Sequence, residues 1–133
     1  MRYLLRAALV LATVPVQANA ASWHRMGSCS YHLDRDGSGS YALISSAPCR
    51  QDFSSGTGTW GARFTWDNGN RVMLFSADGS EDNLTLNDRP VLPQTAGARL
   101  PDSAAYGECH LTDLDGRTEA TCFKPEGEQI QSP

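Results

Sequence analysis

Residues 108–123 read ECHLTDLDGRTEATCF, and this stretch predicts a β-hairpin with a defined register. Asp115-Gly116 favours a two-residue turn, because glycine readily adopts the positive φ that such a turn requires. With these two residues at the tip, counting outward along both strands places Cys109 opposite Cys122. The cysteines then occupy a non-hydrogen-bonded pair, whose α-carbons lie about 4.5 Å apart, within the span of a disulfide. We therefore predict a Cys109–Cys122 bond.

The chain has four cysteines, so Cys29 pairs with Cys49 by elimination. An even number of cysteines in a small exported chain favours disulfides. The spacings lack the closely spaced ligand pairs of a zinc site. A turn at Asp36-Gly37 would put Cys29 opposite Ile44, so we expect Cys49 in the loop that follows this hairpin.

A second hairpin is predicted in the middle of the chain, where residues 60–66 and 71–75 flank Asn68-Gly69. With that pair at the centre of the turn, Trp66 faces Arg71 and Phe64 faces Met73. Alternation along the strand puts these side chains on one face. Such a face is usually a wall of the core, and the alternative is a ligand-binding surface. The candidate binding face consists of Trp60, Phe64, Trp66 and Arg71.

Residues 83–92 predict a third hairpin, with its turn at Asn87-Asp88 and with Pro90 on an edge, because proline cannot donate to a ladder. The chain has 12 glycines, repeated turn signals and no sustained helical period after residue 20. These features predict an all-β fold, a small antiparallel sandwich or barrel built from hairpins with two disulfides. We expect a single β domain over residues 21–123 and a flexible C-terminal tail over residues 124–133.

The N-terminus has the layout of a signal peptide over residues 1–20. Arg2 and Arg6 precede an apolar run of about ten residues, too short to span a bilayer, and Ala18-Asn19-Ala20 supplies a cleavage site. We predict cleavage after Ala20 and a secreted or periplasmic product that is not inserted in the membrane.

Charge argues against nucleic acid as a partner. Loss of residues 1–20, which hold two arginines and no acidic residue, lowers the net charge from −4 to −6. Lys124 is then the one lysine, and the arginines are scattered rather than clustered, unlike those of proteins that bind nucleic acid or anionic lipid. The sequence leaves the partner unknown, with an envelope or extracellular protein as the candidate.

The string Asp34-Arg35-Asp36-Gly37-Ser38 resembles the first half of a calcium-binding EF-hand loop. Asp34, Asp36 and Ser38 are therefore candidate calcium ligands. The second half of the loop is not matched, because Ser45 stands where a bidentate glutamate belongs. A polar turn between two strands is the favoured interpretation, and we predict no metal site.

No catalytic residues or cofactor are predicted. The histidines His24, His32 and His110 are not at ligand spacing. No serine lies in a recognisable nucleophile motif, and the cysteines are expected to be oxidised. We therefore expect a protein that is not an enzyme.

With these hairpins in view, the chain resembles small secreted proteobacterial proteins that carry no assigned function. The shared features are an early cysteine pair, a tryptophan strand before an Asp-Asn-Gly turn, and a closing cysteine hairpin; here they are Cys29 and Cys49, residues 66–69 and residues 107–123. A fainter similarity is to periplasmic lysozyme inhibitors, which are small disulfide-bonded β-barrels, through residues 64–72 and 84–86. The inhibitory segment of that family is not matched in place, so no inhibitory residue is transferred.

We expect an exported, non-catalytic binding or interaction module. The alternatives are a small extracytoplasmic hydrolase, whose site would be assembled by the fold, and a periplasmic lysozyme inhibitor. A rigid disulfide-bonded β framework without a catalytic motif favours the binding module.

Overall fold

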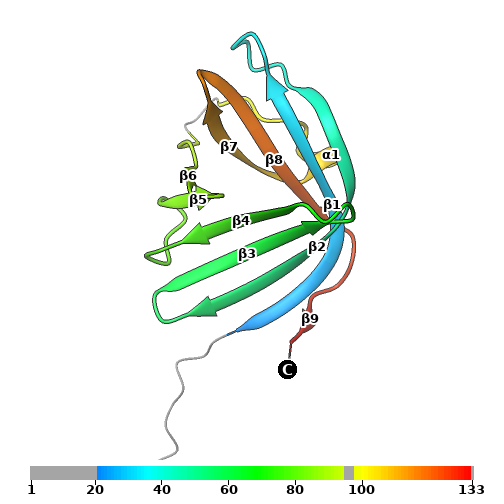
Figure 1. The fold of residues 1–133 in the computed structure, drawn as a ribbon, viewed down its shortest axis with the longest axis vertical. Helices are drawn as coiled ribbons and strands as arrows, with labels where there is room; N and C mark the ends of the chain where they lie inside the picture. Colours follow the sequence, from blue (N-terminus) through cyan, green and yellow to red (C-terminus); the bar gives the residue numbers. More distant parts are fainter. Residues whose placement is uncertain (1–20, 95–97, 133) are drawn as a thin grey trace, which may run out of the picture.

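The computed structural model describes residues 21–94 and 98–132. The predicted signal peptide, residues 1–20, lies outside the described residues, so export and cleavage after Ala20 stay predictions. Within the described ranges, no helix has the length and apolar character needed to cross a membrane. The described chain is built almost entirely of strands (Figure 1).

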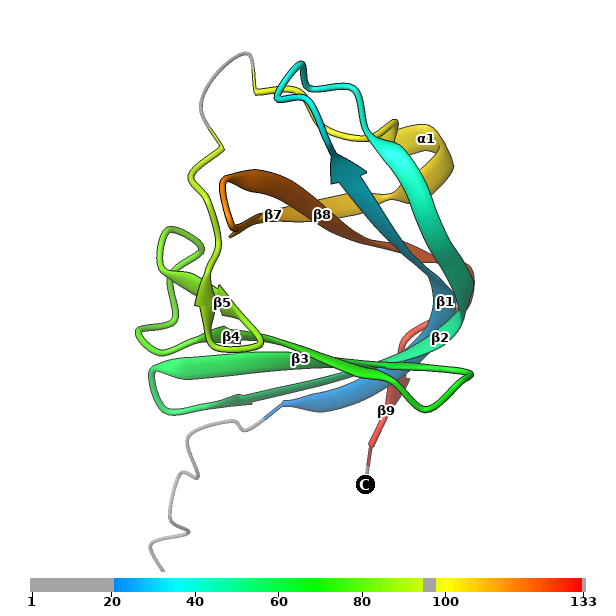
Figure 2. The same ribbon diagram turned by 45° about the horizontal axis from the view of Figure 1, so that its top comes forward.

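Nine strands form one antiparallel sheet: β1 (Ser22–Asp34), β2 (Ala42–Gly56), β3 (Thr59–Trp66), β4 (Arg71–Ser76), β5 (Leu84–Leu86), β6 (Arg89–Pro90), β7 (Glu108–Leu114), β8 (Arg117–Pro125) and β9 (Ile130–Gln131). The order is β6-β5-β4-β3-β2-β1-β8-β7, and β9 pairs with β1. Figure 2 shows these strands arranged around a ring. The all-β prediction is confirmed, and of the two architectures left open by the sequence the structure has the barrel, nearly closed.

The barrel is closed across the gap between β6 and β7 by a few individual hydrogen bonds. The Leu92 N–H donates to the Leu111 carbonyl oxygen at 2.8 Å. Gln94 Nε2 donates to the Cys109 carbonyl oxygen at 3.0 Å, and Arg89 Nη1 donates to that of Asp113 at 3.3 Å. This closure therefore depends on side chains as well as on backbone, unlike the ladders that join the other strands.

The closing hairpin has the register predicted from its turn. Cys109 pairs with Cys122, and their α-carbons lie 4.0 Å apart in the disulfide. Asp115 and Gly116 have φ values of 51° and 83°, as a two-residue turn of this type requires. The predicted and observed registers agree because β7 and β8 are consecutive in the sequence, so the turn between them sets their pairing.

Cys29 and Cys49 form the second disulfide, with α-carbons 5.7 Å apart, but the predicted place of Cys49 is wrong. It lies within β2, opposite Gly27, while Cys29 faces Ala47. The bond therefore joins neighbouring strands diagonally. The register predicted from Asp36-Gly37 fails because the connection is longer than two residues and the pairing shifts between Tyr31 and His32. Two such disulfides indicate an oxidising, extracytoplasmic environment.

The predicted register of the central hairpin is wrong by one residue. Phe64 faces Val72 and Thr65 faces Arg71. The loop contains three residues, 67–69, rather than two, because the Trp66 N–H donates to the Asn70 carbonyl oxygen at 2.8 Å. A shift of one residue exchanges the faces of a strand.

The exchange of faces in β4 reverses its predicted core residues. Leu74 is buried in the barrel at 4% exposure, whereas Met73 and Phe75 are each 40% exposed on the outer face. The prediction for β3 holds, since Ala62, Phe64 and Trp66 are buried.

The third hairpin is confirmed, with positive φ at Asn87 and Asp88 and with Pro90 in the edge strand β6. Strand pairing continues past residue 123, where the sequence places the end of the domain. β8 extends to Pro125, and Gln131 of β9 pairs with Trp23. The tail therefore lies against β1 although it buries little, because backbone pairing does not require apolar side chains.

The core has two parts, one on each face of the sheet. The larger part lies on the inner face of the barrel: Cys29, Cys49, Ala62, Phe64, Trp66, Leu74, Leu84, Leu86 and Phe123. The smaller part, on the outer face of β7 and β8, consists of Cys109, Leu111, Ala120 and Cys122. Tyr106 packs against it from α1 (Ser103–Tyr106), a single helical turn outside the ring (Figure 2).

Candidate ligand cavity and buried polar network

A cavity of about 740 Å³ lies inside the barrel. Aromatic side chains from four strands line it: Trp23, Phe53, Trp60, Phe64 and Phe123. The aliphatic residues Leu74, Leu84 and Leu86 line it from β4 and β5. Its volume falls in the range of sites that bind small molecules. The lining is mixed, because polar side chains contribute to it beside the aromatic and aliphatic ones.

The aromatic rings of the lining pack on one another. The ring centroids of Trp23 and Phe53 are 4.8 Å apart and stacked, and Phe53 lies 6.0 Å from Trp60. Phe64 and Phe123 are 5.1 Å apart on the deeper wall. Trp23, Phe53 and Trp60 come from the paired strands β1, β2 and β3, and their rings therefore support one another in the absence of ligand.

Among the described residues that line the cavity, Arg25 is the one arginine or lysine. Its guanidinium carbon lies 5.1 Å from the Trp23 ring centroid and 5.5 Å from that of Phe123. Its Nε donates to Oε1 of the buried Gln51 at 2.6 Å. Within the part of the chain that the structure describes, no carboxylate forms an ion pair with it.

The remaining charged groups of the lining are the exposed acids Glu81, Asp82 and Glu108, with His110 beside them. His110 Nε2 lies 3.6 Å from Glu108 Oε1. Burial lowers the pKa of His110, while the charges of Glu108 and Glu81 partly oppose that shift. The imidazole is thus mainly neutral at pH 7.

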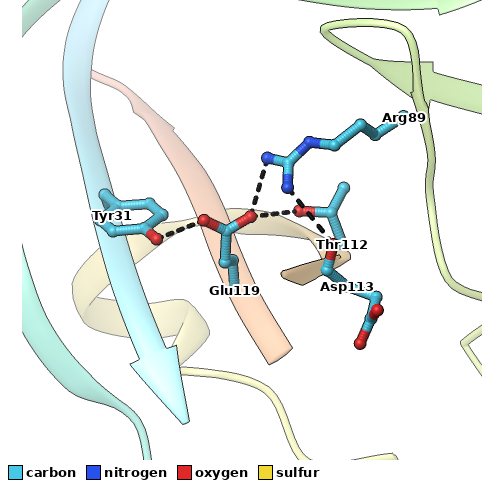
Figure 3. A network of polar contacts seen from close by, with 5 residues as sticks. All are labelled: Tyr31, Arg89, Thr112, Asp113 and Glu119. Carbon is cyan, nitrogen blue, oxygen red and sulfur yellow. Dashed lines mark hydrogen bonds and ion pairs between the residues drawn. The ribbon is translucent and has the colours of Figure 1, made fainter. Parts of the chain in front are cut away.

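A buried polar network lies around Glu119 on the inner face of β8 (Figure 3). Its carboxylate accepts hydrogen bonds from Tyr31 Oη and, at 3.0 Å, from Thr112 Oγ1. Arg89 Nη2 lies 2.8 Å from the same carboxylate. Burial alone raises the pKa of Glu119, but these three donors outweigh it and hold the pKa below its usual value. Burial, with the adjacent Glu119, raises the pKa of Tyr31 to about 12.

The structure divides the candidate binding face predicted from the sequence. Trp60 and Phe64 line the cavity, and Trp66 is buried in the same core. Arg71 is exposed and pairs with Thr65, on the strand face opposite Trp66, because of the register shift. The cation of the cavity is Arg25 instead.

Sequence reasoning missed Arg25, Gln51, Phe53 and Phe123. A signal for Arg25 was present, since Trp23, Arg25, Cys29 and Tyr31 are spaced by multiples of two and so share one face of a strand. Finding the others requires knowing that β1 lies between β2 and β8.

The carboxylates of the calcium candidate stabilise a turn. Asp36 Oδ1 accepts from the Ser38 N–H at 3.0 Å and from its hydroxyl at 2.6 Å, and Asp34 Oδ2 accepts from the Gly39 N–H at 2.8 Å. The hydrogen bonds from Ser38 lower the pKa of Asp36. Among the described residues, no group of three or more metal-ligating side chains is placed to hold an ion.

Outside the barrel, the fold brings a serine and a histidine together. Ser30 Oγ lies 2.8 Å from His32 Nε2, and both residues are buried beside Tyr106. Burial lowers the pKa of His32, which favours the neutral base. Asp34 lies on the same strand face, but its Oδ1 has no hydrogen-bond partner among the described residues, so it does not orient the imidazole. A catalytic triad would need that contact.

Comparison of the chain with family models, with curated proteins and with solved structures found no match. The two resemblances described for the sequence stay predictions.

Proposed function

We propose that this protein is an exported, non-catalytic binding protein that holds a small apolar or aromatic molecule inside its β-barrel. The observation that carries the proposal is the aromatic-lined cavity of about 740 Å³. The predicted signal peptide, together with the two disulfides, supports a secreted or periplasmic location.

The cavity is suited to binding because little has to be ordered when a ligand enters. Its walls are strands joined by ladders, and the Glu119 network with the bonds between β6 and β7 holds the barrel closed. A preformed site avoids the entropy cost of ordering side chains on association. Burial of a ligand against Trp60 and Phe64 would then contribute roughly 25 cal/mol for each Å² of apolar surface.

The proposal is tested with N-phenyl-1-naphthylamine, a neutral apolar fluorophore. We expect saturable binding of one molecule per chain, with quenching of tryptophan fluorescence, because Trp23 and Trp60 line the cavity. Phe64→Ala should weaken binding about tenfold, whereas the matched outer-face variant Phe75→Ala should leave it unchanged. Absence of saturable binding, or equal effects of the two variants, contradicts a site inside the barrel.

The alternative of a small hydrolase rests on the Ser30–His32 hydrogen bond. A fluorophosphonate probe would label Ser30 of a serine hydrolase in the native protein and would not label Ser30→Ala. Since Ser30 is 3% exposed and no acid orients His32, we expect no labelling. Labelling confined to Ser30 would favour the hydrolase over the binding protein.

A further inference from the structure

The charges of the cavity indicate which ligands it accepts, an inference that rests on the proposed function. Arg25 is half-buried, lines the cavity and has no ion-pair partner in the described residues. An arginine removed from water without a partner is costly, because a buried charge is stabilised only by pairing or hydrogen bonding. Its Nε bond to Gln51 satisfies one of its five donors.

The orientation of the guanidinium is set by its neighbours. The rings of Trp23 and Phe123 lie 5.1 Å and 5.5 Å away, and Gln51 holds the Nε side. The two terminal nitrogens remain as a planar fork. Such a fork matches the two oxygens of a carboxylate, and a preorganised donor loses little rotamer freedom when the acid binds.

The acids Glu81, Asp82 and Glu108 would oppose an anion and favour a cation. Their effect is small, however, because they are exposed and salt screens such charges over about 8 Å at physiological ionic strength. Arg25 lies among aromatic rings, where the local dielectric is lower and its attraction for an anion is stronger. The interior cation therefore decides the preference.

We propose that the ligand of the cavity is an amphipathic carboxylic acid, whose carboxylate pairs with Arg25 and whose apolar body lies against Phe53, Trp60 and Phe64. The aromatic walls account for the apolar body, and the unpaired guanidinium accounts for the acid group. The guanidinium carbon lies 5.1 Å from the Trp23 ring, which stacks on Phe53 at 4.8 Å, so one small molecule can contact both the guanidinium and the stacked rings.

The test compares three ligands with the same ten-carbon chain, each displacing N-phenyl-1-naphthylamine from the full-length mature protein. They are decanoate, the neutral 1-decanol and the cationic decyltrimethylammonium. We expect decanoate to bind the wild-type protein about tenfold more tightly than decanol, equivalent to about 1.4 kcal/mol. Decyltrimethylammonium should bind least tightly.

Two variants assign the preference to Arg25. In Arg25→Gln the advantage of decanoate should disappear while decanol affinity stays within about twofold. The control Arg63→Gln, on the outer face of β3, should behave as wild type. The wild-type comparison of the three ligands needs no variant, so it decides the inference even if Arg25→Gln fails to fold.

The outcomes separate the inference from the proposed function. Equal binding of decanoate and decanol, or tightest binding of the cation, overturns the acid preference and leaves the apolar site intact. Retention of the decanoate advantage in Arg25→Gln overturns the role of Arg25. If neither the fluorophore nor any of the three ligands binds, the proposed function and the inference both fail.

Discussion

Arg89 of β6 and Glu119 of β8 form an ion pair of 2.8 Å that spans the gap between β6 and β7, where the barrel lacks a strand ladder. The carboxylate is buried, with 6% of its side chain exposed, whereas Arg89 reaches it from a half-exposed position. The pair links the end strand β6 to β8, and the same arginine also donates to the carbonyl oxygen of Asp113 in β7, the other end strand. Arg89 therefore contributes two contacts to the closure of the barrel, beside the hydrogen bonds of Leu92 and Gln94.

Arg89→Met should lower the free energy of unfolding by about 2 kcal/mol at neutral pH. The substitution leaves the buried Glu119 carboxylate without its cation, and breaking one partner of a buried pair is costly. Urea denaturation followed by tryptophan fluorescence measures the change. Arg50→Met, which removes an exposed ion pair with Asp52, is the matched control and should cost less than about 0.5 kcal/mol. Equal losses of unfolding free energy in the two variants would show that the Arg89–Glu119 pair stabilises the protein no more than an exposed ion pair does.

Glu119→Gln should reduce the loss of stability in acid. The pKa of Glu119 in the folded protein lies below its usual value, so its contribution to stability is present above about pH 4.3 and is lost as the pH falls below it. The wild-type protein should be more stable than Glu119→Gln at pH 7, by roughly 2 kcal/mol. Denaturation curves between pH 3 and pH 8 should show this difference shrinking below about pH 4. A difference that grows in acid would mean that the pKa is raised instead.

Gly27→Ala should destabilise the protein by about 2–3 kcal/mol through overpacking. A Cβ at this position would lie 2.3 Å from the Lys124 carbonyl oxygen and 2.6 Å from the Phe123 ring. The strand glycine Gly56 is the control, since an added Cβ would meet Thr59 Oγ1 at 3.6 Å, an ordinary contact. Thermal melts of Gly27→Ala and Gly56→Ala should differ by several degrees. Similar melting temperatures would contradict the close approach of β8 to β1.

Leu74→Ala and Phe75→Ala distinguish the observed register of β4 from the one predicted by its turn. Leu74 is buried in the barrel, so its truncation should cost about 2–4 kcal/mol. Phe75 lies half-exposed on the outer face, and its loss should cost about 1 kcal/mol or less. Chemical denaturation shows which of the two variants loses more unfolding free energy. A larger loss in Phe75→Ala than in Leu74→Ala would support the register that Asn68-Gly69 predicts.

The candidate site could be predicted only in part. The sequence identifies Trp60 and Phe64 because side chains alternate between the two faces of a strand, and this alternation can be read from one segment alone. The prediction for Arg71 is wrong because the register of its hairpin depends on a three-residue loop, closed by the hydrogen bond from Trp66 to Asn70. Arg25 and Glu119 were missed because each acquires its role from strands distant in the sequence.

What the sequence by itself determined is local: the Cys109–Cys122 pairing, the turns at Asp115-Gly116 and Asn87-Asp88, and the β class. Two-residue turns restrict φ at their own residues, so they define register without help from the rest of the chain. Only the tertiary structure decided between barrel and sandwich, the inward face of β4 and the partners of Arg25 and Glu119. These depend on pairing β1 with β8 and on closing β6 against β7, contacts between segments that are far apart in the chain.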